Sequence, residues 1–418
     1  MTQTHDLAAT GSGRTSVLTL PPATDQVTPF RVHVPDQAVR DLQDRLRSAR
    51  WPPKEPVSDW SEGVPLSELQ RLAGYWLDRY DWRRAEAEIN SFGNCRTLLD
   101  GLGIHFIHVK SPHPNALPLI LTHGWPGSIV ELLDSIGPLV DPVQYGGKAE
   151  DAFHVVVPSL PGFGFSDRPR ERGWDHARTA RAWSQLMDRL GYGHRWVAQG
   201  GDWGSVVVHV LAKMRPPGLR AEHTNWPLVV PLEKPDHMTP QEHRAWTQTV
   251  DFQSVNNGYW RQQATRPQTL GYALQDSPVG LAAWIFEKFQ AWTDNQGRPQ
   301  DALSDDRMLD NISLYWFTGT IASSMRLYLE GAPDGPGPFN AGKIDLPIAA
   351  SIFPHEIFTG RGRTSCGPTS STGTKSTTVG TSRPWSSRRS LSTSCARHFG
   401  GSGREVAAER ARIALVSA

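Results

Sequence analysis

Residues 196–204 read WVAQGGDWG, and this stretch decides the fold. An apolar run ends in a glycine-flanked aspartate, Asp202, and residues 206–214 then have the pattern of a helix. A strand, a sharp turn and a helix in this order form a nucleophile elbow, in which the glycines permit the turn and let the helix pack closely on the strand. A glycine-flanked aspartate is more often a turn or cap residue, but this context favours a nucleophile raised above the carboxyl edge of a sheet.

An aspartate nucleophile restricts the chemistry. A carboxylate suits displacement at a saturated carbon rather than attack on an amide, and it leaves an alkyl ester on the enzyme for water to hydrolyse. Hydrolysis creates a negative oxygen that needs N–H donors, each worth about 3–4 kcal/mol. We expect these donors from the backbone of Trp203 and from Trp125 in the HGWPGS motif at 123–128. The motif could otherwise be only a tight turn, and its Trp125–Pro126 bond is a candidate cis peptide.

Apolar runs alternate with helical patterns along most of the chain. This alternation predicts an α/β fold whose mostly parallel sheet is covered by helices on both faces. We expect strands at 29–34, 98–100, 104–109, 117–122, 153–157, 196–199 and 344–353, and helices at 36–50, 67–80, from 128, 179–190 and 206–214. The expected regions are a loose arm (1–27), an N-terminal region running into the core (28–135), the core (90–230 and 341–359), a helical lid (231–340) and a tail (360–418).

Composition excludes several classes of function. The 418 residues carry 43 basic and 42 acidic side chains, so the net charge of +1 gives no general attraction to nucleic acid or anionic membranes. No stretch approaches the roughly 20 apolar residues of a membrane span, and the first residues lack a secretory signal. Three cysteines, Cys95, Cys366 and Cys395, fit a reducing compartment, so we expect a cytoplasmic protein. No spacing of His, Cys, Asp or Glu indicates a metal site, and we expect no cofactor.

The segment 360–404 departs from this average. It holds seven arginines, Lys375 and no acidic residue, and it is rich in Ser, Thr and Gly. Such a composition can bury little apolar surface, so we expect poor order. A natural basic linker or nucleic-acid tail is one interpretation, and salt-sensitive DNA binding would be its signature.

The motifs resemble those of the microsomal-type epoxide hydrolases, α/β-hydrolases with an N-terminal epoxide-hydrolase domain. The resemblance runs from about residue 28 to 359, and it rests on the elbow together with THGWPGS (122–128), PSLPGFGFS (158–166), DSPVGLAAW (276–284) and YWFTGT (315–320). It implies a cofactor-free enzyme that converts a small apolar epoxide and water to a vicinal diol.

The resemblance also implies roles for three further residues. An epoxide oxygen is a poor leaving group and needs an acid, and the family pattern places two phenols in the lid at Tyr259 and Tyr315. The hydrolytic water needs a base, usually a histidine held by a carboxylate. The family's carboxylate ends a strand, which here points to Glu356, whereas the adjacent His355 is expected to face elsewhere and His209 to be a packed helix residue.

The family's base is missing from this sequence. It lies about 25 residues beyond the acid in a Gly-Gly-His-Phe-Ala-Ala segment, and no such segment occurs here. Residues 373–388 can be encoded by codons that, read one base out of frame, give Asn-Glu-Val-Asp-His-Gly-Gly-His-Phe-Ala-Ala-Met-Glu-Gln-Pro. The lost histidine codon would straddle Gly380 and Thr381, so we infer a frameshift and expect slow hydrolysis of the ester. His398 lies in the wrong context to replace it.

Two other functions remain open at this point. A haloalkane dehalogenase also uses an aspartate elbow followed by tryptophan, but it would need a halide site instead of two phenols. A non-catalytic protein could hold an apolar ligand among the tryptophans without forming a covalent bond. Chloride release, diol formation and binding without adduct formation separate these alternatives.

Overall fold

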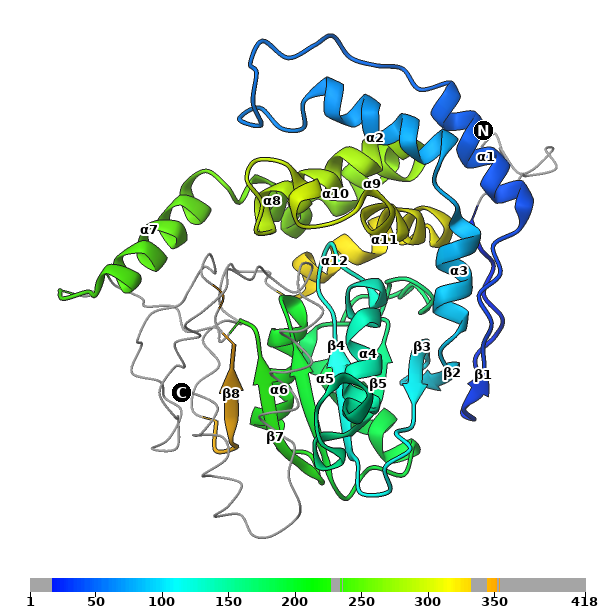
Figure 1. Cartoon of the computed structure of the whole chain (residues 1–418), viewed down its shortest axis with the longest axis vertical. Coiled ribbons are helices and arrows are strands. Elements are labelled where there is room, and N and C mark those ends of the chain that lie inside the picture. Colours follow the sequence, from blue (N-terminus) through cyan, green and yellow to red (C-terminus); the bar gives the residue numbers. More distant parts are fainter. Residues whose placement is uncertain (1–16, 227–233, 235, 332–343, 352, 354–418) are drawn as a thin grey trace, which may run out of the picture.

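The computed structural model of the chain describes residues 17–226, 234, 236–331, 344–351 and 353 (Figure 1). Glu356, the expected partner of the base, lies outside the described residues, and so does the expected tail at 360–418. His355 and His398 also fall outside them.

Residues 17–27, the described part of the expected loose arm, lie along the core instead. The Leu18 N–H donates a hydrogen bond to the Phe317 carbonyl at 2.7 Å, and the Leu98 N–H donates to the Thr24 carbonyl at 2.7 Å. Backbone pairing of this kind holds the segment in place.

Within the described residues, eight strands form one sheet in the order β1-β2-β3-β5-β4-β6-β7-β8. The first four in this order pair antiparallel, and the last five pair parallel, so the prediction of a mostly parallel sheet is confirmed. The strands are β1 (Thr28–Pro29), β2 (Asn94–Leu99), β3 (Leu102–Val109), β4 (Leu117–Thr122), β5 (Phe153–Pro158), β6 (Trp196–Gly200), β7 (Leu219–Thr224) and β8 (Ile348–Ala350).

The helices divide into three groups along the chain. The N-terminal group is α1 (Asp36–Arg47), α2 (Leu66–Asp78) and α3 (Trp82–Asn90). The sheet connections contain α4 (Leu133–Val140), α5 (His176–Arg189) and α6 (Trp203–Met214). The expected lid region contains α7 (Pro240–Ser254), α8 (Gly258–Thr265), α9 (Pro267–Asp276), α10 (Pro278–Trp292), α11 (Asp305–Thr318) and α12 (Ile321–Gly331).

The register of the central strands brings two sequence motifs together. β4 runs parallel to β6, and Thr122 at the end of β4 pairs with Gly200 at the end of β6. All six residues of β4 and all five of β6 are buried, as expected for strands at the centre of a parallel sheet. The HGWPGS loop and the aspartate turn therefore leave the sheet side by side.

The expected strand at 29–34 is wrong beyond its first residue. The chain stays close to α3, whose side chains take over the backbone hydrogen bonds that a neighbouring strand would otherwise make. Asn90 accepts from the Val32 N–H at 2.9 Å and donates to the Val32 carbonyl at 2.8 Å, while Glu86 accepts from the Val34 N–H at 2.6 Å. β1 is therefore only two residues long.

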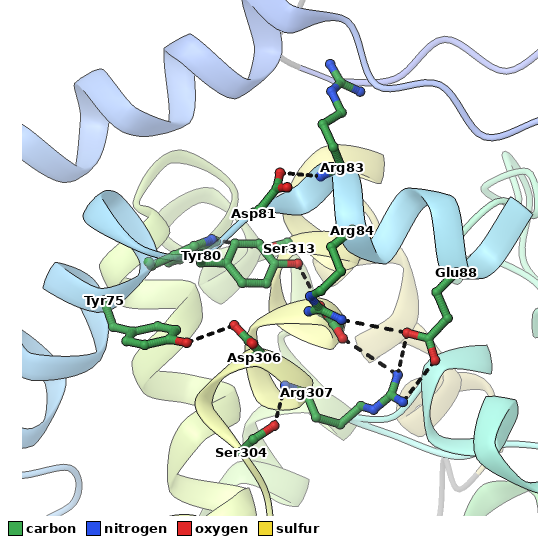
Figure 2. A network of polar contacts seen from close by, with 12 residues as sticks. Tyr75, Tyr80, Asp81, Arg83, Arg84, Glu88, Ser304, Asp306, Arg307 and Ser313 are labelled. Atoms are coloured by element: carbon green, nitrogen blue, oxygen red, sulfur yellow. Dashed lines mark hydrogen bonds and ion pairs between the residues drawn. The ribbon is translucent and has the colours of Figure 1, made fainter.

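A network of hydrogen bonds and ion pairs connects the N-terminal helices to α11 of the expected lid region (Figure 2). The Tyr80 hydroxyl donates to the Asp310 carboxylate at 3.0 Å, and Arg84 forms an ion pair with the same nearly buried group. Arg307 reaches back to Glu88 of α3 at 3.0 Å. Figure 1 shows the helices α8–α12 between the sheet and α2, with α3 beside the sheet. Among the described residues, no helix is both long and apolar enough to cross a membrane.

Candidate active site

Asp202 occupies the sharp turn between β6 and α6. Its backbone has φ 49° and ψ −125°, a conformation that a non-glycine residue adopts only under constraint. A Cβ atom on Gly200 would lie 2.1 Å from the Gly204 carbonyl oxygen, and one on Gly204 would lie 2.1 Å from the Thr122 carbonyl oxygen. Glycine is therefore required on both sides of the turn, and the Asp202 residue itself is exposed at the end of the sheet.

Trp125 provides a direct contact to this aspartate. Its backbone N–H donates a hydrogen bond to Asp202 Oδ1 at 2.8 Å. The Trp125–Pro126 peptide bond is cis, as the sequence suggested. Trp203, the other expected donor, is the first residue of α6 and follows the aspartate directly. Both expected donors therefore lie next to the expected nucleophile.

His123 holds the HGWPGS loop rather than serving as a base. Its Nε2 accepts a hydrogen bond from the Leu160 N–H at 3.1 Å, which assigns the ring proton to Nδ1 and directs it at the Gly124 carbonyl, 3.0 Å away. Burial lowers the pKa of His123 to about 4, so the ring is neutral. The loop is thus tied to the neighbouring PSLPGFGFS segment.

Helix α11 holds the same loop from the lid side. Asn311 donates to the Pro126 carbonyl at 2.8 Å and accepts from the Ser128 hydroxyl at 2.7 Å. Tyr315 donates its phenolic proton to the Gly127 carbonyl at 2.7 Å. The structure therefore uses Tyr315, one of the two expected acids, to fix the backbone of the loop.

The second tyrosine beside Tyr259 is Tyr328 of α12, which the sequence reasoning did not single out. Their rings meet edge to face with centroids 5.9 Å apart. Tyr328 also meets the Trp203 ring at 4.8 Å, and Tyr259 stacks on the Trp125 ring at 5.6 Å with an interplanar angle of 8°. Burial raises the pKa of Tyr328 well above its ordinary value, and the nearby Tyr259 and Asp202 raise it further.

Two other tryptophans complete an aromatic cluster around the turn. Trp260 stacks on Trp203 with centroids 4.9 Å apart, and Trp292 meets Tyr259 at 5.1 Å. The hydroxyl groups of Tyr259 and Tyr328 add polar atoms to these largely aromatic surroundings. Such an arrangement suits a small apolar molecule that carries one hydrogen-bond acceptor.

Glu131 is a further carboxyl group near the turn. Burial raises its pKa well above the ordinary value, and the negative charge of Asp202 adds to this rise. The Gly124 N–H donates to its Oε1 at 3.3 Å, which partly opposes the rise. The neutral acid is therefore favoured, and the residue supports the loop.

His209 is a further candidate among the described residues. His209 is buried inside α6 and contacts Glu222 of β7 at 3.0 Å, in agreement with a packed histidine. No group of three or more His, Cys, Asp or Glu in the described part of the chain is arranged to hold a metal ion. The placement of Glu356 relative to Asp202 stays a prediction.

Comparison with known proteins identifies the family. The model of the epoxide hydrolase N terminus matches residues 27–132, and that of the alpha/beta hydrolase fold matches residues 118–263. A Stigmatella aurantiaca (strain DW4/3-1) protein named as an epoxide hydrolase is 59% identical over 333 residues, which cover 79% of this chain and 75% of that protein. Epoxide hydrolase 1 of Sus scrofa is 34% identical over 360 residues, which cover 80% and 79%. Aspergillus niger epoxide hydrolase matches with a TM-score of 0.68 and 31% identity, over 81% of this chain and 86% of that one. The chain therefore belongs to the epoxide hydrolase family and has the α/β-hydrolase fold.

Proposed function

We propose that this chain converts a small apolar epoxide to a vicinal diol through an alkyl ester on Asp202. The observation that carries the proposal is the hydrogen bond of 2.8 Å from the Trp125 N–H to Asp202 Oδ1, with the Tyr259 ring stacked on Trp125 and the Tyr328 ring against Trp203. Asp202 Oδ1 accepts this hydrogen bond, so we assign the role of nucleophile to the other carboxylate oxygen, Oδ2. Family membership supports the same chemistry.

The first half of the reaction opens the ring. Asp202 Oδ2 attacks a ring carbon, a new C–O bond forms, and the strained C–O bond breaks. The epoxide oxygen takes a proton from Tyr259 or Tyr328, whose hydroxyls can act as acids without presenting a charge to the substrate. Positioned acids of this kind accelerate reactions by about 10²–10⁴-fold.

The second half hydrolyses the ester. Water attacks the Asp202 carbonyl carbon, and the negative charge develops on Oδ1, where the Trp125 N–H already points. The bond from this carbon to the ester oxygen Oδ2 then breaks, and the diol leaves with that oxygen and a proton. The Trp203 N–H is the second donor of this oxyanion hole. A base must take a proton from the water, and we propose that Glu356 would orient that base. Since the family's histidine segment does not occur in this sequence, the ester should accumulate.

Intact-protein mass spectrometry after treatment with styrene oxide tests the proposal. We expect the protein mass to rise by the mass of one epoxide, and we expect Asp202→Asn to abolish the rise. A matched substitution in an exposed carboxylate, Asp294→Asn, should leave the adduct unchanged. Rapid steady-state diol formation by this chain would contradict the expected accumulation, chloride release from an alkyl chloride would favour a dehalogenase, and binding without any adduct would favour a ligand carrier.

A further inference from the structure

Lys288 of α10 is a buried lysine among aromatic rings. Only 6% of its surface is exposed, and its Nζ lies 4.5 Å from the centre of the Tyr259 ring. The rings of Trp292 and Trp284 are 5.6 and 5.8 Å from the same atom. The ammonium group also donates a hydrogen bond to Glu287 Oε1 at 2.8 Å.

A charge in this place is costly unless the surroundings compensate for it. Burying an ammonium group disfavours its charged form, and burial does lower the pKa of Lys288, although Glu287 opposes the change. The faces of three aromatic rings carry negative electrostatic potential and partly replace the lost water. A methionine or leucine would fill the same space without this cost, so packing alone does not account for the lysine.

The position of Tyr259 connects this lysine to the proposed reaction. Its ring stacks on Trp125, whose N–H contacts Asp202, and it meets Tyr328 edge to face. Among the described residues, the charged and titratable groups that these contacts place around the phenol are Lys288 with its partner Glu287 on α10, Tyr328 on α12 and Asp202 at the turn. Lys288 is the cation among them.

We propose that Lys288 is a positioning residue that acts through Tyr259: its ammonium group lies against the phenol ring and stabilises the negative charge that develops when Tyr259 protonates the opening epoxide. This inference rests on the proposed function. In the step concerned, the Tyr259 O–H bond and the epoxide C–O bond break, the proton passes to the epoxide oxygen, and Asp202 forms the ester bond. Lys288 exchanges no atom, and its attraction to the ring grows as the phenol becomes a phenolate.

The test measures the rate of ring opening in single-turnover samples at neutral pH, from the growth of the adduct mass after rapid quenching. We expect Lys288→Met, which keeps the length and loses the charge, to slow adduct formation by about tenfold. Lys288→Arg should retain most of the rate because it keeps the charge. Lys148→Met, at an exposed site, serves as the matched control and should have no effect.

Two further measurements separate an electrostatic role from a structural one. Replacement of Tyr259 by 3-fluorotyrosine, a more acidic phenol, should restore much of the lost rate in Lys288→Met but change the wild-type rate little. Glu287→Gln removes the compensating anion from a partly exposed position, so it should not slow ring opening as Lys288→Met does.

The outcomes are distinguishable from failure of the proposed function. If the wild-type protein forms no adduct, the proposed function is wrong and this inference falls with it. If the wild type forms the adduct and Lys288→Met reacts equally fast, only the role of Lys288 is refuted. A slow Lys288→Met variant that neither fluorotyrosine nor arginine rescues would also refute it, because that pattern describes a packing defect.

Discussion

The carboxylate of Asp202 accepts a backbone hydrogen bond before any substrate binds. Oδ1 accepts the Trp125 N–H at 2.8 Å, and in the proposed mechanism this oxygen becomes the carbonyl of the ester. Donors fixed in advance need no reorganisation when the charge develops, which is why they stabilise a transition state more than water does. In the proposed mechanism Oδ2 is the attacking atom.

The tyrosines around Asp202 should differ in what they contribute. We expect Tyr259→Phe and Tyr328→Phe each to slow adduct formation by about 10²-fold or more, because each removes an acid next to the reacting oxygen. Tyr315→Phe should instead lower the free energy of unfolding by about 1–3 kcal/mol, since it leaves the Gly127 carbonyl unpaired, and it should slow the reaction less. Quenched mass spectrometry and urea unfolding measure the two effects. A slower reaction in Tyr315→Phe than in Tyr328→Phe would reverse the assignment.

Sequence reasoning singled out Asp202, Trp125 and Trp203 because glycines and prolines mark their turns. It did not single out Tyr328, because the surrounding residues, MRLYLE at 325–330, contain no such marker and have the pattern of an ordinary core helix. Tyr315 stood out through its YWFTGT motif. Only the packing of α12 against α8 distinguishes the two tyrosines, and local pattern carries no information about that contact.

At the scale of elements, α11 holds the HGWPGS loop in place through side-chain hydrogen bonds. The loop leaves β4 and crosses the end of the sheet, and its Pro126 and Gly127 carbonyls accept hydrogen bonds from α11. Asn311 and Tyr315 lie one helical turn apart, so both reach the loop from the same face of α11. Helix α11 of the expected lid region therefore fixes the backbone of the HGWPGS loop.

Removal of one of these hydrogen-bonding side chains should lower the free energy of unfolding by a measurable amount. Asn311→Ala deletes the donor to the Pro126 carbonyl and the acceptor for the Ser128 hydroxyl, both buried. We expect the free energy of unfolding to fall by about 1–3 kcal/mol for an unpaired buried group, measured by urea denaturation. Asn256→Ala, at an exposed position, should change it by less than about 0.5 kcal/mol. Equal stability of the two variants would show that the loop does not depend on α11.

Some elements could be predicted to the residue and others could not. β4 begins and ends as expected, because an apolar run of strand length stops at a glycine- and proline-containing loop. The strand expected at 29–34 has the right alternation, yet Asn90 and Glu86 satisfy its backbone instead of a second strand. Alternation predicts which side chains face the core, but it cannot identify the partner of a backbone N–H.

The whole molecule contains several histidines that folding keeps neutral. Burial lowers the pKa of His105 to about 3 and that of His123 and His176 to about 4, from an ordinary value near 6.5. Between about pH 6.5 and pH 4 the unfolded chain therefore binds more protons than the folded one. Stability contributed by these rings is present at neutral pH and is lost as the pH falls.

Urea unfolding at about pH 7 and about pH 5 tests this dependence. We expect the free energy of unfolding to decrease on acidification by about 1.4 kcal/mol per pH unit for each such histidine below its unfolded pKa. The decrease should precede protonation of ordinary carboxylates. A free energy of unfolding that stays constant over this range would contradict the neutral buried state.

Restoration of the reading frame should change the kinetics of the whole enzyme. A variant whose residues from 373 onward are replaced by the alternative frame regains the Gly-Gly-His-Phe segment. We expect it to form diol continuously and to hold little ester, because the base for the second step is back. Chromatography of the diol together with intact-protein mass measures both. Equal diol formation by the present chain would show that the missing segment is dispensable.

Localisation of the covalent bond tests the account most directly. The protein is treated with styrene oxide, digested, and each peptide is sequenced by tandem mass spectrometry. The account predicts one modified site, with the mass of one epoxide on the carboxylate of Asp202. Modification of another residue such as Cys95 with Asp202 unchanged, or an unmodified protein that still forms diol, would contradict it.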